Sequence, residues 1–181
     1  MRVISGSARG RKLKEPVGSS IRPSSDRVKE SIFNIIQFDV QGRRVLDLFA
    51  GTGQLGIEAL SRGAKSAVFI DSSEKSVKLI LENINICGFS ACSTVYCKDA
   101  LRYLENDEKF DVIFIDPPYE STLAKKAIIK IAEFDKLNIN GIIICESKND
   151  STPPFLLPQY VSHKEYKYGG VRITKYTHEE P

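Results

Sequence analysis

The residues best suited to chemistry form the stretch Asp116-Pro117-Pro118-Tyr119, which directly follows the apolar run FDVIFI. A strand that simply ends in a turn needs neither a carboxylate nor an aromatic ring. The exocyclic amino group of a nucleobase is a poor nucleophile, and it becomes a better one when acceptors bind its two N–H bonds. The Asp116 carboxylate and the Pro117 carbonyl, fixed by the two prolines, could be those acceptors. Tyr119 could stack on an extruded base, so Asp116, Pro117 and Tyr119 are the predicted catalytic residues.

A second candidate site is the loop in LDLFAGTGQLGIEAL, where Gly51, Gly53 and Gly56 match the spacing G-x-G-x-x-G. Glycines let the backbone turn sharply and approach a ligand closely. Asp71 ends the next predicted strand, about twenty residues on, where a carboxylate can accept hydrogen bonds from both hydroxyls of a ribose. The pattern predicts a nucleoside cofactor bound by Gly51, Gly53 and Asp71.

Two features favour S-adenosylmethionine over NAD as this cofactor. Asp47 lies four residues before Gly51, where its charge would oppose a pyrophosphate but attract the ammonium and sulfonium groups of S-adenosylmethionine. No dehydrogenase role explains the stretch that begins at Asp116. Asp99 closes a further predicted strand and is expected to lie beside the adenine amino group. Asp99 could also cap the helix that follows it, and the two roles are compatible.

The elements that must position these residues follow from the apolar patterns. From residue 44 onward, short apolar runs alternate with helical patterns, which predicts an α/β fold with right-handed crossovers and a mostly parallel sheet covered on both faces. Two β-like runs around Gly169-Gly170 predict an antiparallel hairpin that completes a seven-stranded sheet. The expected parallel strands are 44–50, 66–71, 92–99, 110–116 and 141–147, and the expected helices are 54–63, 73–88, 100–107 and 122–137.

The length of 181 residues fits one domain with a small extension. We expect residues 1–43 to be a basic extension and helix, and residues 44–181 to be the catalytic domain. The helix should begin after Pro23, with Ser24 or Ser25 as its N-cap.

Charge is unevenly distributed along the chain. Residues 1–44 hold ten Lys/Arg and four Asp/Glu, whereas residues 45–181 hold sixteen and nineteen. A basic segment on a nearly neutral body suggests a polyanionic partner, although a solvated surface segment is the alternative. Because the segment is rich in glycine and serine, we expect its cations to be free to reach phosphates. The predicted RNA-binding residues are Arg9, Arg11, Lys12, Lys14 and Arg27.

Several classes of protein are disfavoured by the composition. No run approaches eighteen apolar residues, so a membrane span is not expected. The first residues, MRVISGSARG, lack the apolar core of a signal peptide, and we expect a cytoplasmic protein. The four cysteines do not have the spacing of zinc sites, so no metal is expected.

Four longer blocks make the interpretation more specific. RVISGSARGRKLKEP, RPSSDRVKESIFNII, DLFAGTGQLGIEALSRGA and YGGVRITKY together resemble the RsmD family over essentially the whole chain. The resemblance implies a Rossmann-like methyltransferase fold and methyl transfer from S-adenosylmethionine to a guanine N2 in bacterial 16S ribosomal RNA. It also implies a small-ribosomal-subunit substrate and no metal, and it places Arg22 and Ser24 near the cofactor.

Three alternatives remain open from the residues. The same Asp-Pro-Pro-Tyr stretch serves methylation of adenine N6 in DNA or RNA, although the chain has no long insertion for reading a DNA target. The glycine loop alone would suit an NAD-dependent oxidoreductase. A non-catalytic RNA-binding module is disfavoured because Asp116 and Tyr119 are both present.

Overall fold

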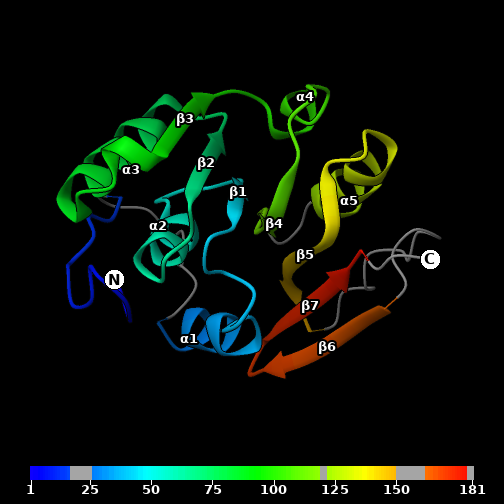
Figure 1. The fold of residues 1–181 in the computed structure, drawn as a ribbon, viewed down its shortest axis with the longest axis horizontal. Helices are drawn as coiled ribbons and strands as arrows, with labels where there is room; N and C mark the ends of the chain where they lie inside the picture. The colour runs from blue at the N-terminus through cyan, green and yellow to red at the C-terminus, as the bar shows by residue number, and fades with distance from the viewer. Residues whose placement is uncertain (17–25, 119–121, 150–161, 179–181) are drawn as a thin grey trace.

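A single seven-stranded sheet organises the protein (Figure 1). The computed structural model describes residues 1–16, 26–118, 122–149 and 162–178. The strands are β1 (Arg44–Leu48), β2 (Ser66–Asp71), β3 (Ser93–Cys97), β4 (Phe110–Ile115), β5 (Leu137–Lys148), β6 (Ser162–Tyr168) and β7 (Val171–Thr177). The helices are α1 (Asp26–Ile35), α2 (Gln54–Ser61), α3 (Glu74–Cys87), α4 (Ala100–Tyr103), α5 (Leu123–Glu133) and the 3-10 turn η1 (Ser90–Cys92).

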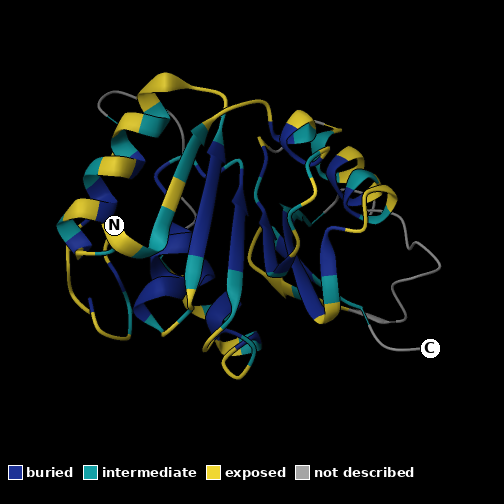
Figure 2. Ribbon diagram, turned by 45° about the horizontal axis from the view of Figure 1, so that its top comes forward, coloured by how far each residue is buried: buried dark blue, intermediate teal, exposed yellow. Residues whose placement is uncertain are grey.

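The strand order is β3-β2-β1-β4-β5-β7-β6. Strands β1 to β5 are parallel, and β7 runs antiparallel to both β5 and β6. This confirms the predicted α/β fold with a C-terminal antiparallel hairpin. The central strands are buried on both faces, as parallel strands between two helical layers must be (Figure 2).

The helices form two layers over the sheet. Apolar side chains of α1, α2 and α3 pack in one core with Val45, Phe69 and Phe114. Those of α4 and α5 pack in a second core with Leu46 and Ile113 on the opposite face. The alternation along β1 and β4 divides the apolar residues between the two cores, so each strand supports both layers.

The register of β1 and β4 determines where the site lies. Leu48 pairs with Ile115, so the glycine loop that follows β1 and the stretch that follows β4 leave the sheet side by side. The chain runs from β1 to β2 and β3 on one side, and then returns from β3 to β4 on the other side of β1. Ligands bind at this reversal of strand order in open α/β sheets. We call this the carboxyl edge of the sheet.

Residues 1–16 form an N-terminal hairpin that packs against α2 and α3. Arg2 and Lys12 are bridged in antiparallel fashion, and Val3, Ala8 and Leu13 are buried in the same core as the sheet. Gly6 approaches α2 so closely that a Cβ there would lie 1.7 Å from the Ser61 carbonyl oxygen. The segment is therefore a docked part of the fold.

The expectation that the basic side chains are free to reach phosphates is wrong for two of them. Arg11 Nη1 donates to the Ile86 carbonyl oxygen at 2.8 Å, and Lys14 Nζ lies 2.9 Å from a Glu82 oxygen. Both interactions hold the hairpin on α3. Part of the positive charge that we expected to contact a polyanionic partner therefore lies in contacts between the hairpin and α3.

A buried carboxylate on α2 anchors the hairpin. Glu58 is fully buried and accepts hydrogen bonds from the backbone N–H groups of Ile4 at 2.8 Å and Ser5 at 3.0 Å. Arg62 Nε donates to the same carboxylate at 2.8 Å, and Lys29 Nζ on α1 lies 3.9 Å away. Burial lowers the pKa of Lys29, opposed by the Glu58 charge. This cluster ties the hairpin, α1 and α2 together.

Several predicted boundaries differ from the structure. The helix expected over 122–137 ends at Glu133, and β5 begins at Leu137 rather than at Gly141. Asp135 and Asn140 adopt positive φ angles of 48° and 60°, and the register with β4 shifts near Phe110. The helix expected over 100–107 is a single turn.

Candidate active site

The glycine loop has the conformation that its residue types require. Gly51 and Gly53 have φ angles of 57° and 76°, in the left-handed region that glycine tolerates without strain. A Cβ on Gly53 would lie 3.2 Å from Ile80 on α3. The loop is therefore packed closely on α3 at the carboxyl edge, where Gly51 is half-buried and Gly53 is buried.

Asp71 supports this loop directly. Its Oδ2 accepts a hydrogen bond from the Gly51 N–H at 2.8 Å, and its Oδ1 accepts one from the Ser73 N–H at 2.9 Å. Each carboxylate oxygen has a further lone pair, so the group can accept additional hydrogen bonds from a ligand. The structure thus brings Asp71 and Gly51 together, as the spacing predicted.

Asp99 lies at the same edge, two residues beyond Cys97, which pairs with Asp71. Its Oδ1 accepts a hydrogen bond from the Arg102 N–H at 2.9 Å. The capping role suggested by the sequence is confirmed. A contact between Asp99 and an adenine amino group stays a prediction.

Asp47 is buried beneath the loop with 2% of its surface exposed. Its Oδ2 accepts a hydrogen bond from the Gly56 N–H in the first turn of α2 at 2.9 Å. Burial raises the pKa of Asp47 to about 7, and the nearby Asp71 charge acts in the same direction. The carboxylate therefore carries only part of its charge at neutral pH in the free protein. Its attraction for a cationic ligand stays a prediction.

Asn83 on α3 connects the loop to the N-terminal hairpin, and the sequence did not indicate it. The side chain is fully buried. Its Nδ2 donates to the Thr52 carbonyl oxygen at 3.0 Å and to the Lys14 carbonyl oxygen at 3.1 Å, and its Oδ1 accepts from the Lys14 N–H at 2.7 Å. One amide thus fixes the cofactor loop and the hairpin to the same helix.

Gln54 is a second residue that the sequence did not indicate. It is the first residue of α2, directly after Gly53, and it is buried. Within the part of the chain that the structure describes, its Oε1 has no hydrogen-bond partner. The loop therefore has an unused acceptor beside it.

The predicted catalytic stretch leaves the sheet next to the glycine loop. Asp116 is half-buried and Pro117 is buried. Burial raises the pKa of the Cys145 thiol on neighbouring β5 to about 12, and the Asp116 charge acts in the same direction. Ile115 pairs with Cys145, so Asp116 follows at the carboxyl end of β4, beside β5. Tyr119, and the cofactor candidates Arg22 and Ser24, lie outside the described residues.

The predicted RNA-binding residues lie on the surface. Arg9, Arg11, Lys12, Lys14 and Arg27 are all exposed. Arg11 contacts the last turn of α3, which the crossover from β2 to β3 places toward the amino edge. Lys14 is linked to the glycine loop through Asn83. A contact between these residues and RNA stays a prediction.

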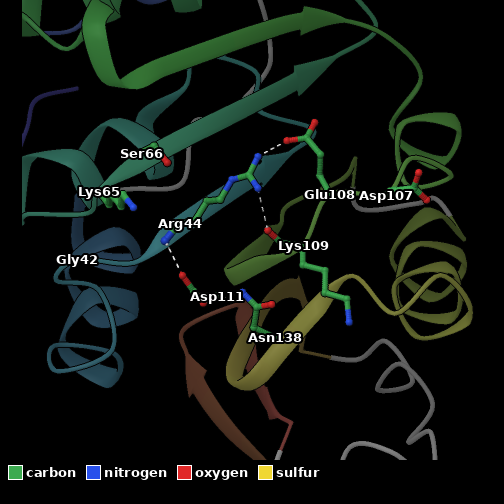
Figure 3. Close-up of a pocket in the computed structure, with 9 residues that line it drawn as sticks. All are labelled: Gly42, Arg44, Lys65, Ser66, Asp107, Glu108, Lys109, Asp111 and Asn138. Atoms are coloured by element: carbon green, nitrogen blue, oxygen red, sulfur yellow. Dashed lines mark hydrogen bonds and ion pairs between the residues drawn. The ribbon is translucent and has the colours of Figure 1, made fainter.

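An open hollow of about 900 Å³ lies at the opposite, amino edge of the sheet (Figure 3). There the Arg44 N–H donates to Asp111 at 2.7 Å, while its guanidinium contacts Glu108. These charges neutralise one another, and the hollow is separated from the glycine loop by the length of β1. We therefore place the candidate site at the carboxyl edge. The hollow is lined by Gly42, Arg44, Lys65, Ser66, Asp107, Glu108, Lys109, Asp111 and Asn138.

Two further observations concern metals and membranes. Among residues 1–16, 26–118, 122–149 and 162–178, no three His, Cys, Asp or Glu side chains gather as metal ligands would. None of the helices described there combines the length and apolar character needed to cross a membrane.

Known proteins are similar to this sequence along most of its length. The family model described as Conserved hypothetical protein 95 matches residues 1–177. The chain is 41% identical to "Putative rRNA methyltransferase YlbH" of Bacillus subtilis, with 97% of this chain and 98% of that protein covered. It is 35% identical to "Ribosomal RNA small subunit methyltransferase D" of Haemophilus influenzae, with 88% and 83% covered.

Solved structures share the fold. "Putative methyltransferase yhhF from Escherichia coli" is 28% identical with a TM-score of 0.90, and 100% of this chain and 99% of that chain are covered. A 16S rRNA N2 methyltransferase of T. thermophilus, in complex with AdoMet and guanosine, is 20% identical with a TM-score of 0.69, covering 91% and 45%. At 20% identity the likeness is one of fold alone.

Proposed function

Since the chain belongs to the RsmD family, which the Conserved hypothetical protein 95 model over residues 1–177 describes, we propose that it methylates the N2 amino group of a guanine in 16S ribosomal RNA. The family makes the chain an S-adenosylmethionine-dependent rRNA methyltransferase. The guanine, its N2 atom and the small ribosomal subunit as substrate are the proposal. One structural observation supports methyl transfer to an amino group at this site: the glycine loop after β1 and Asp116 after β4 leave adjacent strands at one edge of the sheet.

The residues at this edge fit S-adenosylmethionine. Bound there, the cofactor would supply an electrophilic methyl group. The left-handed Gly51 and Gly53 allow close approach of the backbone, and Asp71 would accept hydrogen bonds from the ribose hydroxyls. Asp99 would lie beside the adenine. Asp47 and the unpaired Oε1 of Gln54 lie beneath the loop, where they would favour a cationic group.

Asp116 and Pro117 would act on the nucleobase. The Asp116 carboxylate and the Pro117 carbonyl would accept hydrogen bonds from the two N–H bonds of the target amino group. These bonds localise the nitrogen lone pair toward the methyl group, and they strengthen as positive charge develops on the nitrogen. Tyr119 would stack on the extruded base.

Guanine is the base that the available likenesses favour. The neighbour from T. thermophilus is named an N2 methyltransferase and holds guanosine. The Haemophilus influenzae relative is named for the small ribosomal subunit. Both statements concern those proteins: the first supports guanine N2 over adenine N6 here, and the second supports a small-subunit rRNA substrate.

The test is a reconstituted reaction. Small ribosomal subunits from a strain that lacks this gene are incubated with the purified protein and S-adenosylmethionine, and the rRNA is digested to nucleosides for mass spectrometry. N2-methylguanosine is the expected product. N6-methyladenosine, or no methylated nucleoside from a protein that binds S-adenosylmethionine, would overturn the proposal. The naked 16S RNA, tested in parallel, would tell whether the assembled particle is required.

A further inference from the structure

The turn between β6 and β7 lies at the carboxyl edge, where Asp116 also lies. β7 begins at Val171, which pairs with Lys148 at the end of β5, and β5 runs parallel to β4. The turn Gly169-Gly170 that joins β6 to β7 is therefore on the catalytic side of the sheet. In Figure 1, β7 lies next to β5 and β6 lies beyond it.

One face of β6 presents a cation and two aromatic rings. Lys164, Tyr166 and Tyr168 are alternate residues, so they lie on the same face of the strand, and we call them the Tyr168 face. Lys164 is exposed, Tyr166 is half-buried against the core below α1, and 36% of the Tyr168 surface is exposed. Among the described strands, β6 pairs with β7 alone. It is therefore an edge strand, and the Tyr168 face lies at the outer border of the sheet.

The distance from this face to the catalytic stretch follows from the register. Ile115 pairs with Cys145, so Asp116 and Glu146 are at one level. Glu146 pairs with Ile173, and Ile173 pairs with Tyr166. Three strand spacings separate β4 from β6, which is roughly 14 Å, and Tyr168 lies two residues farther along, roughly 7 Å. A nucleic acid strand can span this distance with a few nucleotides.

The turn that carries Tyr168 is fixed by hydrogen bonds. The Asn149 N–H donates to the Gly170 carbonyl oxygen at 3.1 Å, the Asn149 side chain donates to the Gly169 carbonyl oxygen, and the Arg172 guanidinium donates to the Asn149 carbonyl oxygen. A ring held in place loses little freedom when a ligand binds. The turn is therefore suited to binding rather than to flexible connection.

The hairpin also has an excess of positive charge. Residues 162–178 contain four Lys/Arg and one acidic residue, Glu165. Arg172 pairs with Glu165 and Lys175 with Asp39, which leaves Lys164 and Lys167 for a partner. Aromatic rings interleaved with cations are the pattern that binds unpaired nucleotides, because rings stack on bases and cations contact phosphates. A protein partner would instead require a larger apolar surface than one exposed tyrosine.

We propose that the Tyr168 face, together with Lys167 on the opposite face of the same edge strand, binds at the outer border of the sheet the unpaired nucleotides that flank the target base. Tyr168 stacks on one of these bases, and Lys164 and Lys167 contact the phosphates beside it. The inference rests on the proposed RNA substrate and assigns it a second contact surface, distinct from the catalytic stretch and from the N-terminal hairpin.

The test uses a short fluorescein-labelled single-stranded RNA of mixed sequence and measures its binding by anisotropy. Tyr168→Ala should weaken binding about tenfold, the effect of losing one base–aromatic stack, and Tyr168→Phe should retain wild-type affinity. Lys164→Ala combined with Lys167→Ala should reduce the slope of log affinity against log salt by roughly 0.7 per contact. Phe38→Ala is the matched control, because Phe38 is 90% exposed and lies between α1 and β1.

Methylation of small subunits gives the second measurement. Tyr168→Ala should raise the KM for subunits and leave kcat, S-adenosylmethionine affinity and the unfolding midpoint unchanged. If the wild type binds and methylates RNA while Tyr168→Ala matches Phe38→Ala in both assays, the Tyr168 face is not an RNA surface. If the wild type binds S-adenosylmethionine but neither binds nor methylates RNA, the proposed function fails, and this inference fails with it.

Discussion

Replacing Asn83 with alanine is expected to loosen the cofactor loop and the N-terminal hairpin together. The amide is fully buried and makes three hydrogen bonds, one to Thr52 and two to the backbone of Lys14. Alanine is tolerated well within a helix, so the effect should come from these bonds rather than from the helix itself.

The magnitude follows from the groups that lose their partner. The Thr52 carbonyl is buried, so losing its hydrogen bond should cost roughly 1–3 kcal/mol. Water can reach the two partly buried Lys14 groups, so losing each of their hydrogen bonds should cost roughly 0.5–1 kcal/mol. The free energy of unfolding should therefore fall by about 3 kcal/mol. For a chain of this size the melting temperature should fall by roughly 6–12 °C.

Urea unfolding and calorimetric titration with S-adenosylmethionine are the two assays. Because Thr52 lies between Gly51 and Gly53, loss of its bond should also weaken cofactor binding by roughly fivefold, ~1 kcal/mol. Asn85→Ala is the matched control, because it changes the same residue type at an exposed position of the same helix. Loss of less than ~0.5 kcal/mol in Asn83→Ala, with unchanged cofactor affinity, would refute the role given to Asn83.

Three further outcomes are expected. Asp116→Ala should lower kcat far more than it lowers S-adenosylmethionine affinity, because the carboxylate acts on the base during transfer; near-normal turnover in single-turnover assays would contradict this. Asp71→Ala should weaken S-adenosylmethionine binding tenfold or more by calorimetry, roughly 1.5–3 kcal/mol for each charged hydrogen bond lost, and undiminished affinity would remove Asp71 from the site. Burial raises the Asp47 pKa from its ordinary 3.8 to about 7, so the folded protein holds a proton there that the unfolded chain releases. That stabilisation is complete below about pH 4 and is lost as pH rises through 7. Asp47→Asn should remove this decline in urea titrations at successive pH values, and an unchanged decline would show that another group causes it.

The sheet and the glycine loop were predictable because their signals are local. The run VIFI predicts a buried strand without reference to any distant residue. The spacing from Gly51 to Asp71 predicts that the acid and the loop meet, and they do at 2.8 Å. The parallel register then follows from the crossover connections.

The buried polar residues were not predictable in the same way. The sequence pattern predicts that the polar side chains Lys29, Glu58 and Asn83 face solvent on their amphipathic helices. They are buried because the N-terminal hairpin covers them. Each bonds a backbone group more than twenty residues away in sequence, although Glu58 also pairs with Arg62, four residues later. Nearly every residue carries the same backbone N–H and C=O groups, so the order of residue types does not indicate which backbone group a side chain will bond.

The start of β5 was missed for a different reason. Leu137 continues the apolar period of α5, so the pattern predicts helix where the chain has already turned at Asp135. A positive φ at a non-glycine residue depends on tertiary packing, which a local pattern does not contain.

The docking of the N-terminal hairpin has a consequence for how the protein is made. The hydrogen bonds that attach it to α2 and α3 join residues 53 to 75 positions apart. During synthesis the hairpin emerges before α2 and α3, so its attachment is complete only after α3 has left the ribosome. Contacts of such long sequence separation also slow folding, because a long loop must close before they form. The first sixteen residues therefore wait as an undocked segment, and the cofactor loop acquires its final support only when that segment returns.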